Sequence, residues 1–225
     1  MPPSRPIEFE SLGLRPFAEV LGYQKELRQR RQAGEIVDRV LFVEHPRVIT
    51  RGRRPADEDF RVPVERLREA GFQVEDAGRG GKLTYHGPGQ LVAYFIVSLR
   101  ERRWGIPEFV RRIEAAILQC LAEYGIAGER RAEYPGVWIG GRKIASIGLS
   151  VDRGVSMNGI ALNVDPRLED FETIVPCGIP GCEMTSIRRE TNQSPGLEEV
   201  SRLLADGISD AFVEEAQVKA AKSNL

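Results

Sequence analysis

The chain has 225 residues and a formal net charge of −1, with 41% hydrophobic and 29% charged residues. Its length suffices for one large domain with a buried core, and its near-neutral charge excludes a protein that holds nucleic acid through overall positive charge. The longest apolar run, 91–99, is too short to span a bilayer, and residues 1–10 lack the apolar segment of a secretory signal. We therefore expect neither a nucleic-acid nor a membrane partner.

Cysteine and histidine are scarce. Three cysteines stand at 120, 177 and 182, and two histidines at 45 and 86. They are too few and too irregularly spaced for a disulfide framework or a structural zinc site. We expect a cytoplasmic protein with reduced thiols and without a metal. Arginines gather at 28–32, 51–54 and 100–104, which indicates solvated surface or a docking face for an acidic protein partner.

The first half of the chain predicts two helices, several strands and a glycine-rich loop. Apolar periodicity and the positions of glycine and proline set the boundaries of these elements. In chain order we expect a helix at 16–33, a strand at 35–46 and a short strand from 47. A helix from Pro63 to Gly71, a strand at 72–76, the loop at 78–89 and a buried strand at 90–99 follow.

The second half begins with a helix that starts at Pro107, carries the clearest apolar stripe and ends at Gly125. Residues 136–164 predict a meander with turns at 140–141 and 152–154. A last helix is expected over 195–215, with Ser194 as its N-cap, and residues 216–225 are expected to fray. This order predicts an α/β (α+β) fold, a mixed β-sheet flanked by helices in a single domain over 1–225.

The glycine-rich loop, GRGGKLTYHGPG, fits a nucleotide site poorly. It lacks the GxxxxGK[ST] pattern and runs into a strand, so no helix N-terminus faces a phosphate. Its glycines allow close passage of a ligand, while Tyr85 and His86 make it bulky enough to form the wall of an apolar pocket. His86 itself is open to two interpretations, a satisfied structural histidine or a positioning and proton-relay group.

Cys177 lies in the segment IVPCGIPG, between Pro176 and Gly178. Proline fixes the backbone and glycine permits a sharp turn whose amide N–H can face an oxyanion, an arrangement that holds a nucleophile. The alternative is a buried loop cysteine. Cys182, five residues on, is expected to be a bystander, with a resolving thiol as its alternative.

Lys143 begins an alternating segment, RKIASIGLSV. Strict alternation would place it on the more apolar face, with Ala145 and Ile147. One interpretation is a strand-end lysine that reaches solvent. The other is a partly desolvated ammonium beside a thiol, in which case the cation favours the thiolate form.

Four segments together carry a family resemblance: RGGKLTYHGPGQLVAYFIVSL, GVWIGGRKIASIGLSV, NGIALNV and PCGIPGCEMTSI. Over about 36–215 the chain resembles lipoate-protein octanoyltransferase, the LipB family. The resemblance implies the fold of the biotin and lipoate protein ligase catalytic domain. It also implies that octanoyl-acyl carrier protein donates an octanoyl group, which Cys177 accepts as a thioester and passes to a lysine of a lipoyl domain, the first step of endogenous lipoate synthesis. Lys143 matches the lysine that favours the thiolate and moves protons.

The resemblance further implies a set of substrate-binding residues and partners. No cofactor is implied, and the implied acceptors are the lipoyl domains of 2-oxoacid dehydrogenases and the glycine cleavage H protein. The family usually has histidine where this chain has Asn158, which cannot shuttle a proton and would serve orientation. The matching substrate-binding positions are Arg79, Gly80, Gly81, Lys82, Leu83, Thr84, Tyr85, His86, Ser146, Ile147, Gly148, Gly159, Ile160 and Ala161.

Three alternatives remain at this point. An ATP-dependent lipoate or biotin-type protein ligase would share the fold but need an adenylate site. A cysteine amidase or peptidase would pair Cys177 with His86. A degenerate lipoyl-domain-binding protein would form no acyl adduct, an idea that Asn158 motivates.

Overall fold

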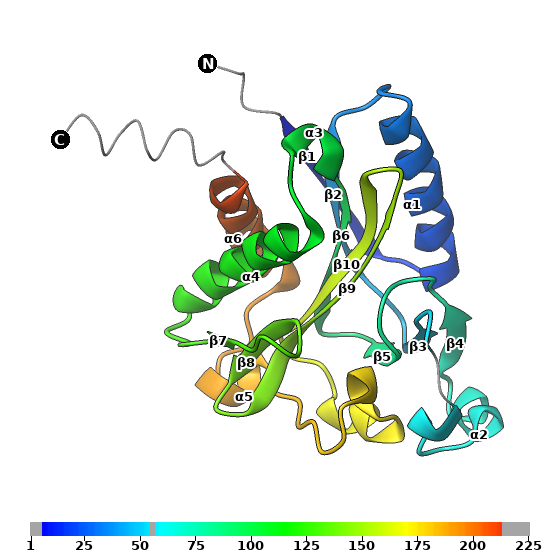
Figure 1. The fold of residues 1–225 in the computed structure, drawn as a ribbon. Helices are drawn as coiled ribbons and strands as arrows, with labels where there is room; N and C mark the ends of the chain where they lie inside the picture. The colour runs from blue at the N-terminus through cyan, green and yellow to red at the C-terminus, as the bar shows by residue number, and fades with distance from the viewer. Residues whose placement is uncertain (1–5, 55–56, 213–225) are drawn as a thin grey trace.

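The structure is a computed structural model, and it describes residues 6–54 and 57–212. Its centre is a seven-stranded sheet in which only the first two strands pair in parallel, so the mixed sheet expected from the sequence is confirmed (Figure 1). In spatial order the strands are β1 (Ile7–Leu14), β2 (Asp38–Glu44), β6 (Gln90–Ile96), β10 (Val155–Asn163), β9 (Arg142–Asp152), β8 (Gly136–Ile139) and β7 (Glu129–Arg130).

A second, three-stranded sheet lies beside one end of the first. Its order is β4 (Gln73–Asp76), β3 (Val48–Arg51) and β5 (Leu83–His86), and α2 (Val64–Glu69) contacts β4. Three 3₁₀ turns complete this end of the molecule, at Asp57–Asp59, Leu168–Thr173 and Pro176–Gly178. The small sheet has its own apolar cluster, built around Ile49, Leu83 and Tyr85.

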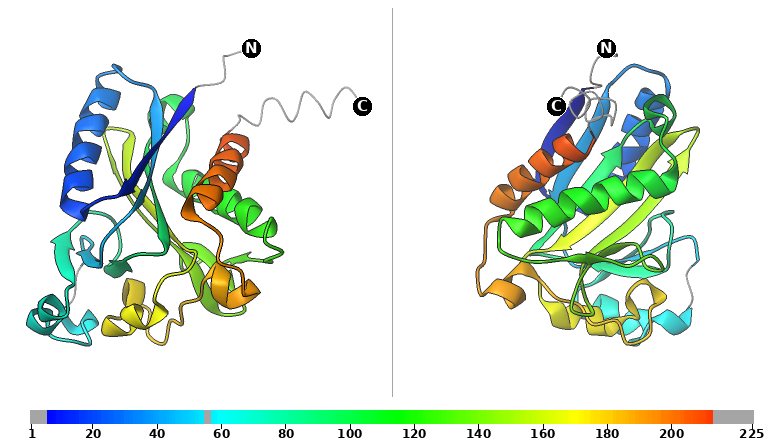
Figure 2. Two further views of the ribbon diagram at one scale, coloured as in Figure 1. Left: turned by 180° about the vertical axis from the view of Figure 1, so that it is seen from behind. Right: turned by 60° about the vertical axis from the view of Figure 1, so that its left-hand side comes forward.

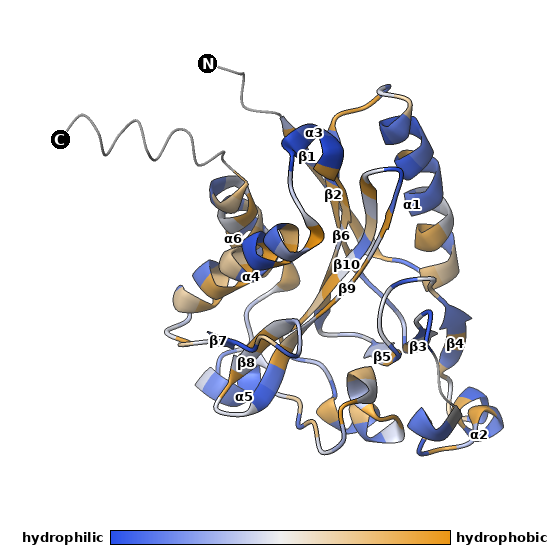
Figure 3. Cartoon of the chain, viewed as in Figure 1, coloured by the Kyte–Doolittle hydropathy of each residue, from blue (hydrophilic) through white to orange (hydrophobic). Residues whose placement is uncertain are grey.

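Helices cover both faces of the large sheet. The pair α4 (Ile106–Ala122) and α6 (Leu197–Ala211) packs on one face, and α1 (Phe17–Gln32) covers part of the other (Figure 2). Two short helices, α3 (Leu99–Arg102) and α5 (Ile187–Thr191), join the layers. Figure 3 shows apolar residues concentrated on the central strands while the outer surface of α1 is hydrophilic, as layered packing requires.

The main helices and strands are confirmed, with several differences. The segment predicted as a loop at 78–89 contains the strand β5, and β7, α3 and α5 were not predicted. The strand β1 was not expected, because it is a half-exposed edge strand without a continuous apolar run. The last helix starts at Leu197 with Gly196 as its N-cap, and the Ser194 hydroxyl instead donates to the carboxylate of Asp165. The predicted helix residues 213–215 and the predicted frayed tail, 216–225, lie outside the described residues.

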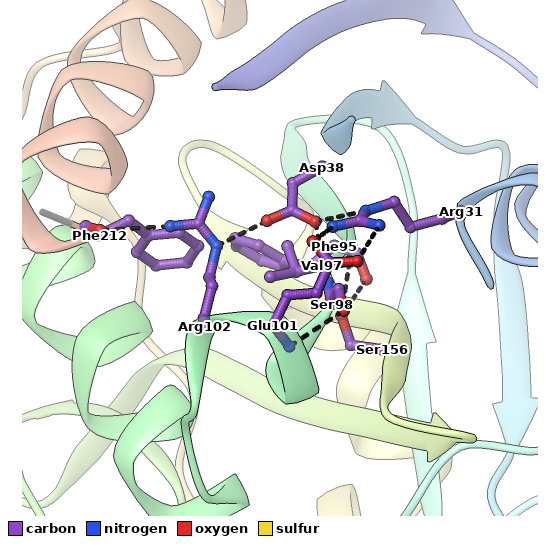
Figure 4. A network of polar contacts seen from close by, with 9 residues as sticks. All are labelled: Arg31, Asp38, Phe95, Val97, Ser98, Glu101, Arg102, Ser156 and Phe212. Atoms are coloured by element: carbon purple, nitrogen blue, oxygen red, sulfur yellow. Dashed lines mark hydrogen bonds and ion pairs between the residues drawn. The ribbon is translucent and has the colours of Figure 1, made fainter. Parts of the chain in front are cut away.

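A buried charge cluster joins α1, β2 and α3. The Asp38 carboxylate accepts from Arg31 Nε at 2.8 Å, from Arg102 Nε at 2.6 Å and from the Ser98 amide at 2.9 Å (Figure 4). Arg102 also donates to the Phe212 carbonyl, at the end of α6. Arg31, Asp38 and Arg102 are all buried, so the Asp38 carboxylate is shared by two guanidinium groups removed from water, and Glu101 pairs with Arg31 as well.

Asp38→Asn is expected to destabilise the protein by about 3–5 kcal/mol, because it leaves two buried cations without their shared carboxylate. Urea denaturation measures the loss. Glu101→Gln is the matched control: Glu101 also pairs with Arg31, but its side chain is 43% exposed, so it should cost about 1 kcal/mol or less. Equal costs for the two variants would contradict the assignment of Asp38 as the centre of the cluster.

Candidate active site

Cys177 occupies a tight turn in a strained conformation. Its φ is 57° and its ψ is 11°, in the left-handed region that side chains other than glycine and asparagine rarely enter. The preceding chain is anchored to the 3₁₀ turn at Asp57–Asp59, where the Val175 amide donates to the Asp59 carbonyl at 2.7 Å and Phe60 forms a bridge with Ile174. Strain of this kind persists where surrounding contacts enforce it, and it clusters at active sites.

The amide groups of this turn are used differently from the expectation. The Gly178 N–H donates to the Val175 carbonyl at 3.0 Å and so closes the turn, and it does not face an oxyanion. A β-carbon on Gly178 would lie 2.1 Å from Lys82 Cδ, so glycine at this position makes room for the Lys82 side chain. Within the described chain the Cys177 N–H has no acceptor, which leaves it free to donate to a carbonyl oxygen beside the sulfur.

Lys143 lies on the opposite face of β9 from the one that strict alternation predicts. Val137 pairs with Ala145, but the next residue, Trp138, pairs with Lys143, so β9 has one extra residue, a β-bulge. Ala145 and the odd-numbered residues beyond it contact the cluster under α4 and α6. The bulge reverses the alternation and turns Lys143 away from that cluster toward Cys177.

The segment after Cys177 fastens to β9 at Lys143 itself. The Lys143 N–H donates to the Glu183 carbonyl at 2.8 Å, and the Thr185 N–H donates to the Lys143 carbonyl at 2.9 Å. The Lys143 Nζ then lies 3.7 Å from the Cys177 Sγ. Backbone pairing of Lys143 with the segment that follows Cys177 thus brings together two side chains that are 34 positions apart in the sequence.

Lys143 is buried, with 2% of its surface exposed, and its ammonium has no carboxylate partner within the described chain. Its Nζ lies 5.1 Å from the centre of the Trp138 ring, a cation–π distance. A β-carbon at Gly136 would come within 2.7 Å of Lys143 Cε, so the glycine admits the lysine stem. The Cys177 sulfur is thus the nearest group that could compensate the Lys143 side chain.

Arg79 adds a second buried positive charge. Its terminal nitrogens donate to the carbonyls of Gly80, Lys82 and Thr50 and to the Thr50 hydroxyl, all neutral acceptors. Burial lowers the pKa of Arg79 from its ordinary value, and a Cys177 thiolate acts in the opposite direction. Arg79 and the thiolate therefore stabilise each other electrostatically. Ser146 lies on the other side of the sulfur, with its Oγ 4.0 Å from the Cys177 Sγ.

Two spaces meet at Cys177. The inner cavity is narrow, about 30 Å³, so a ligand larger than a water molecule would enter it only as the surrounding side chains move apart. The outer cleft measures about 490 Å³. Four residues line both spaces: Arg79, Ile147, Gly148 and Cys177. The inner cavity is also lined by Phe17, Ala77, Thr84, His86, Tyr94, Ser146, Asn158, Gly159, Ile160 and Ala161.

The predicted substrate loop divides between these spaces. Gly80, Gly81, Lys82 and Lys143 line the outer cleft, whereas Thr84 and His86 line the inner cavity. Leu83 and Tyr85 reach neither, contrary to the expectation that Tyr85 shapes the pocket. Alternation along β5 turns both into the apolar cluster of the small sheet, where the Tyr85 hydroxyl donates to Asp170 at 2.7 Å.

The small residues of β9 and β10 serve the backbone as well as the cavity. A β-carbon on Gly148 would lie 2.9 Å from Arg79 Cδ, and one on Gly159 would lie 1.8 Å from the Ala93 carbonyl oxygen. The absence of a β-carbon at Gly148 therefore makes room for Arg79, and its absence at Gly159 allows the neighbouring strand β6 to approach. Packing within the protein thus explains both glycines, in addition to any ligand. Ile160 and Ala161 follow in the same strand.

A buried group of two histidines and a tyrosine lies at the inner cavity, where His86 and Tyr94 form part of the lining and His45 supports Tyr94. His45 Nδ1 donates to the Arg15 carbonyl at 2.7 Å, which leaves its Nε2 to accept from the Tyr94 hydroxyl at 2.8 Å. His86 Nδ1 donates to Gln90 Oε1, because the Gln90 amide nitrogen donates elsewhere. Burial, with smaller effects of His45 and Arg79, lowers the pKa of His86 to about 3. His86 is neutral near pH 7 and makes no hydrogen bond to Cys177.

His86 predicts a pH dependence of stability. Its pKa is about 3 in the folded chain and ~6.5 when unfolded, so the unfolded state binds the proton first. The stability is full above about pH 6.5 and falls as pH drops toward about 3, by ~1.4 kcal/mol per pH unit for one proton. We expect His86→Gln to show a flatter decline of unfolding free energy from pH 6 to pH 4 in urea titrations. An unchanged slope would contradict the assignment.

Asn158 adopts a φ of 64°, a conformation that asparagine tolerates better than most residues. Its side-chain nitrogen donates to the Ser150 hydroxyl at 3.0 Å, and its backbone N–H donates to Gln24 Oε1 at 3.0 Å. Neither contact involves Cys177 or Lys143. The local geometry thus gives Asn158 bonds that join β10 to β9 and α1.

The other two cysteines make no hydrogen bond to Cys177 or Lys143 within the described chain, although Cys182 is close enough for both to influence the pKa of its thiol. Cys120 is buried on α4, and burial raises the pKa of its thiol to about 12. Burial likewise raises the pKa of Cys182, whose sulfur lies 3.9 Å from that of Met184. Across residues 6–54 and 57–212, no three histidine, cysteine or acidic side chains gather as a metal site would require, and no helix has the length and apolar character to cross a membrane.

Sequence reasoning missed several residues of the site. His45 and Tyr94 each looked like one polar residue within an apolar strand, and only the pairing of β2 with β6 joins them. Gly136 and Thr50 support Lys143 and Arg79 from distant segments. A signal was present for Gly136, since a glycine within a strand often marks a close approach of another group.

Comparison with known proteins places the chain in a family. The family described as the lipoyl protein ligase A/B catalytic domain matches residues 16–209. A solved lipoate protein ligase from Thermoplasma acidophilum superimposes with a TM-score of 0.70 at 16% identity, over 91% of this chain and 83% of that one. The chain therefore belongs to the lipoyl protein ligase A/B catalytic domain family.

Within that family, the similar curated proteins are octanoyltransferases. The octanoyltransferase of Alkaliphilus metalliredigens is 45% identical over 79% of this chain and 82% of its own length. That of Chloroflexus aurantiacus is 38% identical over 96% of this chain and 98% of its own length. The resemblance drawn from the sequence motifs is thereby confirmed.

Proposed function

We propose that the protein transfers an octanoyl group from octanoyl-acyl carrier protein to a lysine of lipoyl domains, through a thioester on Cys177. The observation that carries the proposal is the buried pair in which Lys143 Nζ lies 3.7 Å from the Cys177 sulfur, where the inner cavity meets the outer cleft. Family membership supports the same acyl-transfer chemistry in lipoate biosynthesis.

In the first half-reaction the Cys177 thiolate attacks the carbonyl carbon of the incoming thioester. A new carbon–sulfur bond forms, the bond to the carrier's sulfur breaks, and that sulfur leaves with the electron pair and takes up a proton. Lys143 and Arg79 stabilise the attacking thiolate, and the free Cys177 N–H can donate to the carbonyl oxygen as negative charge develops there. The acyl chain enters the inner cavity beside Ile160 and Ala161.

In the second half-reaction the acceptor lysine releases its ammonium proton to solvent, and the neutral amine attacks the Cys177 thioester. The carbon–nitrogen bond forms, the carbon–sulfur bond breaks, and the electron pair returns to Cys177. The surplus proton on nitrogen passes to the sulfur through Lys143, the cationic group in contact with it. Exchange of one thioester for another is nearly balanced in energy, and conversion of a thioester to an amide is downhill, so the proposed reaction requires no ATP.

The proposed donor is octanoyl-acyl carrier protein, and the proposed acceptors are lipoyl domains of 2-oxoacid dehydrogenases and the glycine cleavage H protein. A nucleophilic thiol and two further free cysteines fit a reducing compartment, so the proposed location is the cytoplasm. The amidase alternative is disfavoured by His86, whose low pKa and lack of contact with Cys177 make it a poor general base near pH 7.

The test is a two-stage reaction without ATP. The protein is incubated with octanoyl-acyl carrier protein, and intact-mass spectrometry is expected to show one octanoyl adduct that hydroxylamine removes. Addition of a lipoyl domain should then move the adduct to that domain. Transfer only with ATP would favour a ligase, release of free octanoate faster than transfer would favour a hydrolase, and binding without any adduct would favour a degenerate binding protein.

A further inference from the structure

The outer cleft has two charged residues at its rim that the chemistry at Cys177 does not use. Arg54 lies in the loop after β3, and Glu133 lies in the loop between β7 and β8. Both are exposed, and within the described chain neither side chain has an ion pair or hydrogen bond. The other charged residues of the cleft are engaged: Lys82 pairs with Asp59 at 3.0 Å, and Arg79 and Lys143 are buried.

The body of the cleft suits a thin, mostly apolar arm. Its volume of about 490 Å³ lies within the usual range for a small-molecule site, and Cys177 forms part of its lining. Its apolar lining comes from four elements and includes Ile106, Val110, Tyr134, Leu149 and Ile179. Of these, Ile106 and Tyr134 are large side chains that remain exposed, 52% and 40% respectively. The mouth of the cleft is therefore lined by apolar side chains, and among the described residues its rim carries one unpaired cation, Arg54, and one unpaired anion, Glu133.

Two arms of opposite charge must reach the same sulfur in turn. The donor arrives on a phosphopantetheine arm, whose phosphate is anionic. The acceptor arrives as a lysine side chain, whose amine is mostly an ammonium near neutral pH. A single cleft that admits both gains from one cation and one anion at its mouth, since each arm then meets a partner of opposite charge.

We propose that the outer cleft is a shared entrance in which Arg54 binds the phosphate of the donor's arm and Glu133 binds the ammonium of the acceptor lysine. This inference rests on the proposed function and adds to it the residues that recognise each substrate. The backbone of Arg54 is joined to the glycine loop, because its N–H donates to the carbonyl of Gly81 at 3.3 Å. The two residues act in different half-reactions, so their effects separate.

The donor half is tested with small thioesters in place of the carrier. Thiol release is measured for S-octanoyl phosphopantetheine and for S-octanoyl pantetheine, which lacks the phosphate. We expect Arg54→Ala to raise KM for the phosphorylated donor about five- to tenfold with kcat unchanged, and to leave KM for the other donor unaltered. Arg153→Ala is the matched control, an exposed arginine in the β9–β10 turn that pairs with its neighbour Asp152.

The acceptor half is tested on enzyme already carrying the octanoyl group. Transfer to a lipoyl domain is followed by mass, and Glu133→Gln is expected to raise KM for that domain about fivefold while thiol release from either donor stays normal. Each variant is thus the control for the other, because each should alter one half-reaction only.

Equal effects of Arg54→Ala on the two donors would overturn the phosphate assignment, and an effect of Glu133→Gln on thiol release, or none on transfer, would overturn the ammonium assignment. These outcomes are distinct from failure of the proposed function. That failure would appear as absence of thiol release and of adduct in the unaltered protein with every donor, and the shared entrance would fail with it.

Discussion

Cys177→Ala is expected to abolish octanoyl transfer, with a loss of about 10³-fold or more in kcat. In the proposed reaction the variant lacks the atom that carries the acyl group between donor and acceptor. Alanine keeps a β-carbon at φ 57°, so it bears the same backbone strain as cysteine and should leave the turn unchanged. The rate of lipoyl-domain octanoylation measures the loss, and thermal unfolding checks the fold.

Cys182→Ala is the matched control for that experiment. Cys182 lies five residues further on, and its sulfur contacts Met184 and the Glu183 carbonyl, not Cys177. It should transfer octanoate at the normal rate and still form the adduct. Normal transfer by Cys177→Ala, or loss of the adduct in Cys182→Ala, would refute a Cys177 thioester.

Lys143→Met is the second large effect, with transfer reduced about 10²-fold. Methionine retains most of the buried stem but removes the ammonium 3.7 Å from the sulfur. The Cys177 thiolate then loses its nearest positive charge, so alkylation by iodoacetamide at pH 7 should slow at least tenfold. Each tenfold change corresponds to ~1.4 kcal/mol.

The pH dependence separates this electrostatic role from a packing defect. At a pH where the thiol of either protein is fully ionised, the alkylation rates of the variant and the parent should converge. A packing defect would instead leave the variant slow, or fast, at every pH. Unchanged alkylation at pH 7 would show that Lys143 does not stabilise the thiolate.

Local sequence patterns were sufficient for most elements. The helices at 17–32 and 106–122 and the meander of β8, β9 and β10 follow apolar periodicity and glycine turns closely. The strand β1 was not predicted, because its edge position leaves most of its residues exposed and its sequence therefore lacks an apolar pattern. The N-cap of α6 was predicted wrongly, because the hydroxyl of Ser194 bonds to Asp165, a residue 29 positions away.

The central pair of the candidate site was indicated by the sequence, but part of its lining and its geometry were not. The motifs indicated Cys177 and Lys143, yet alternation placed Lys143 on the wrong face, because a β-bulge is set by pairing with β8 and leaves no clear trace in one strand's sequence. Tyr85 was expected to form part of the pocket wall because its side chain is bulky, but it lies in the apolar cluster of the small sheet. Its direction depends on which face of β5 the small sheet buries, which is a tertiary property. Contacts such as His45 with Tyr94 depend entirely on strand order.

The position of Cys177 between two spaces has a consequence for how specificity can change. The residues that surround the inner cavity beyond the sulfur differ from those that form the mouth of the outer cleft. In the proposed reaction, a substitution at Ala161 would alter the tolerated length of the acyl chain, whereas one at Glu133 would alter the choice of acceptor. The two selectivities are therefore separable, and new pairings of fatty acid and target protein can arise by single steps without disturbing the reactive thiol.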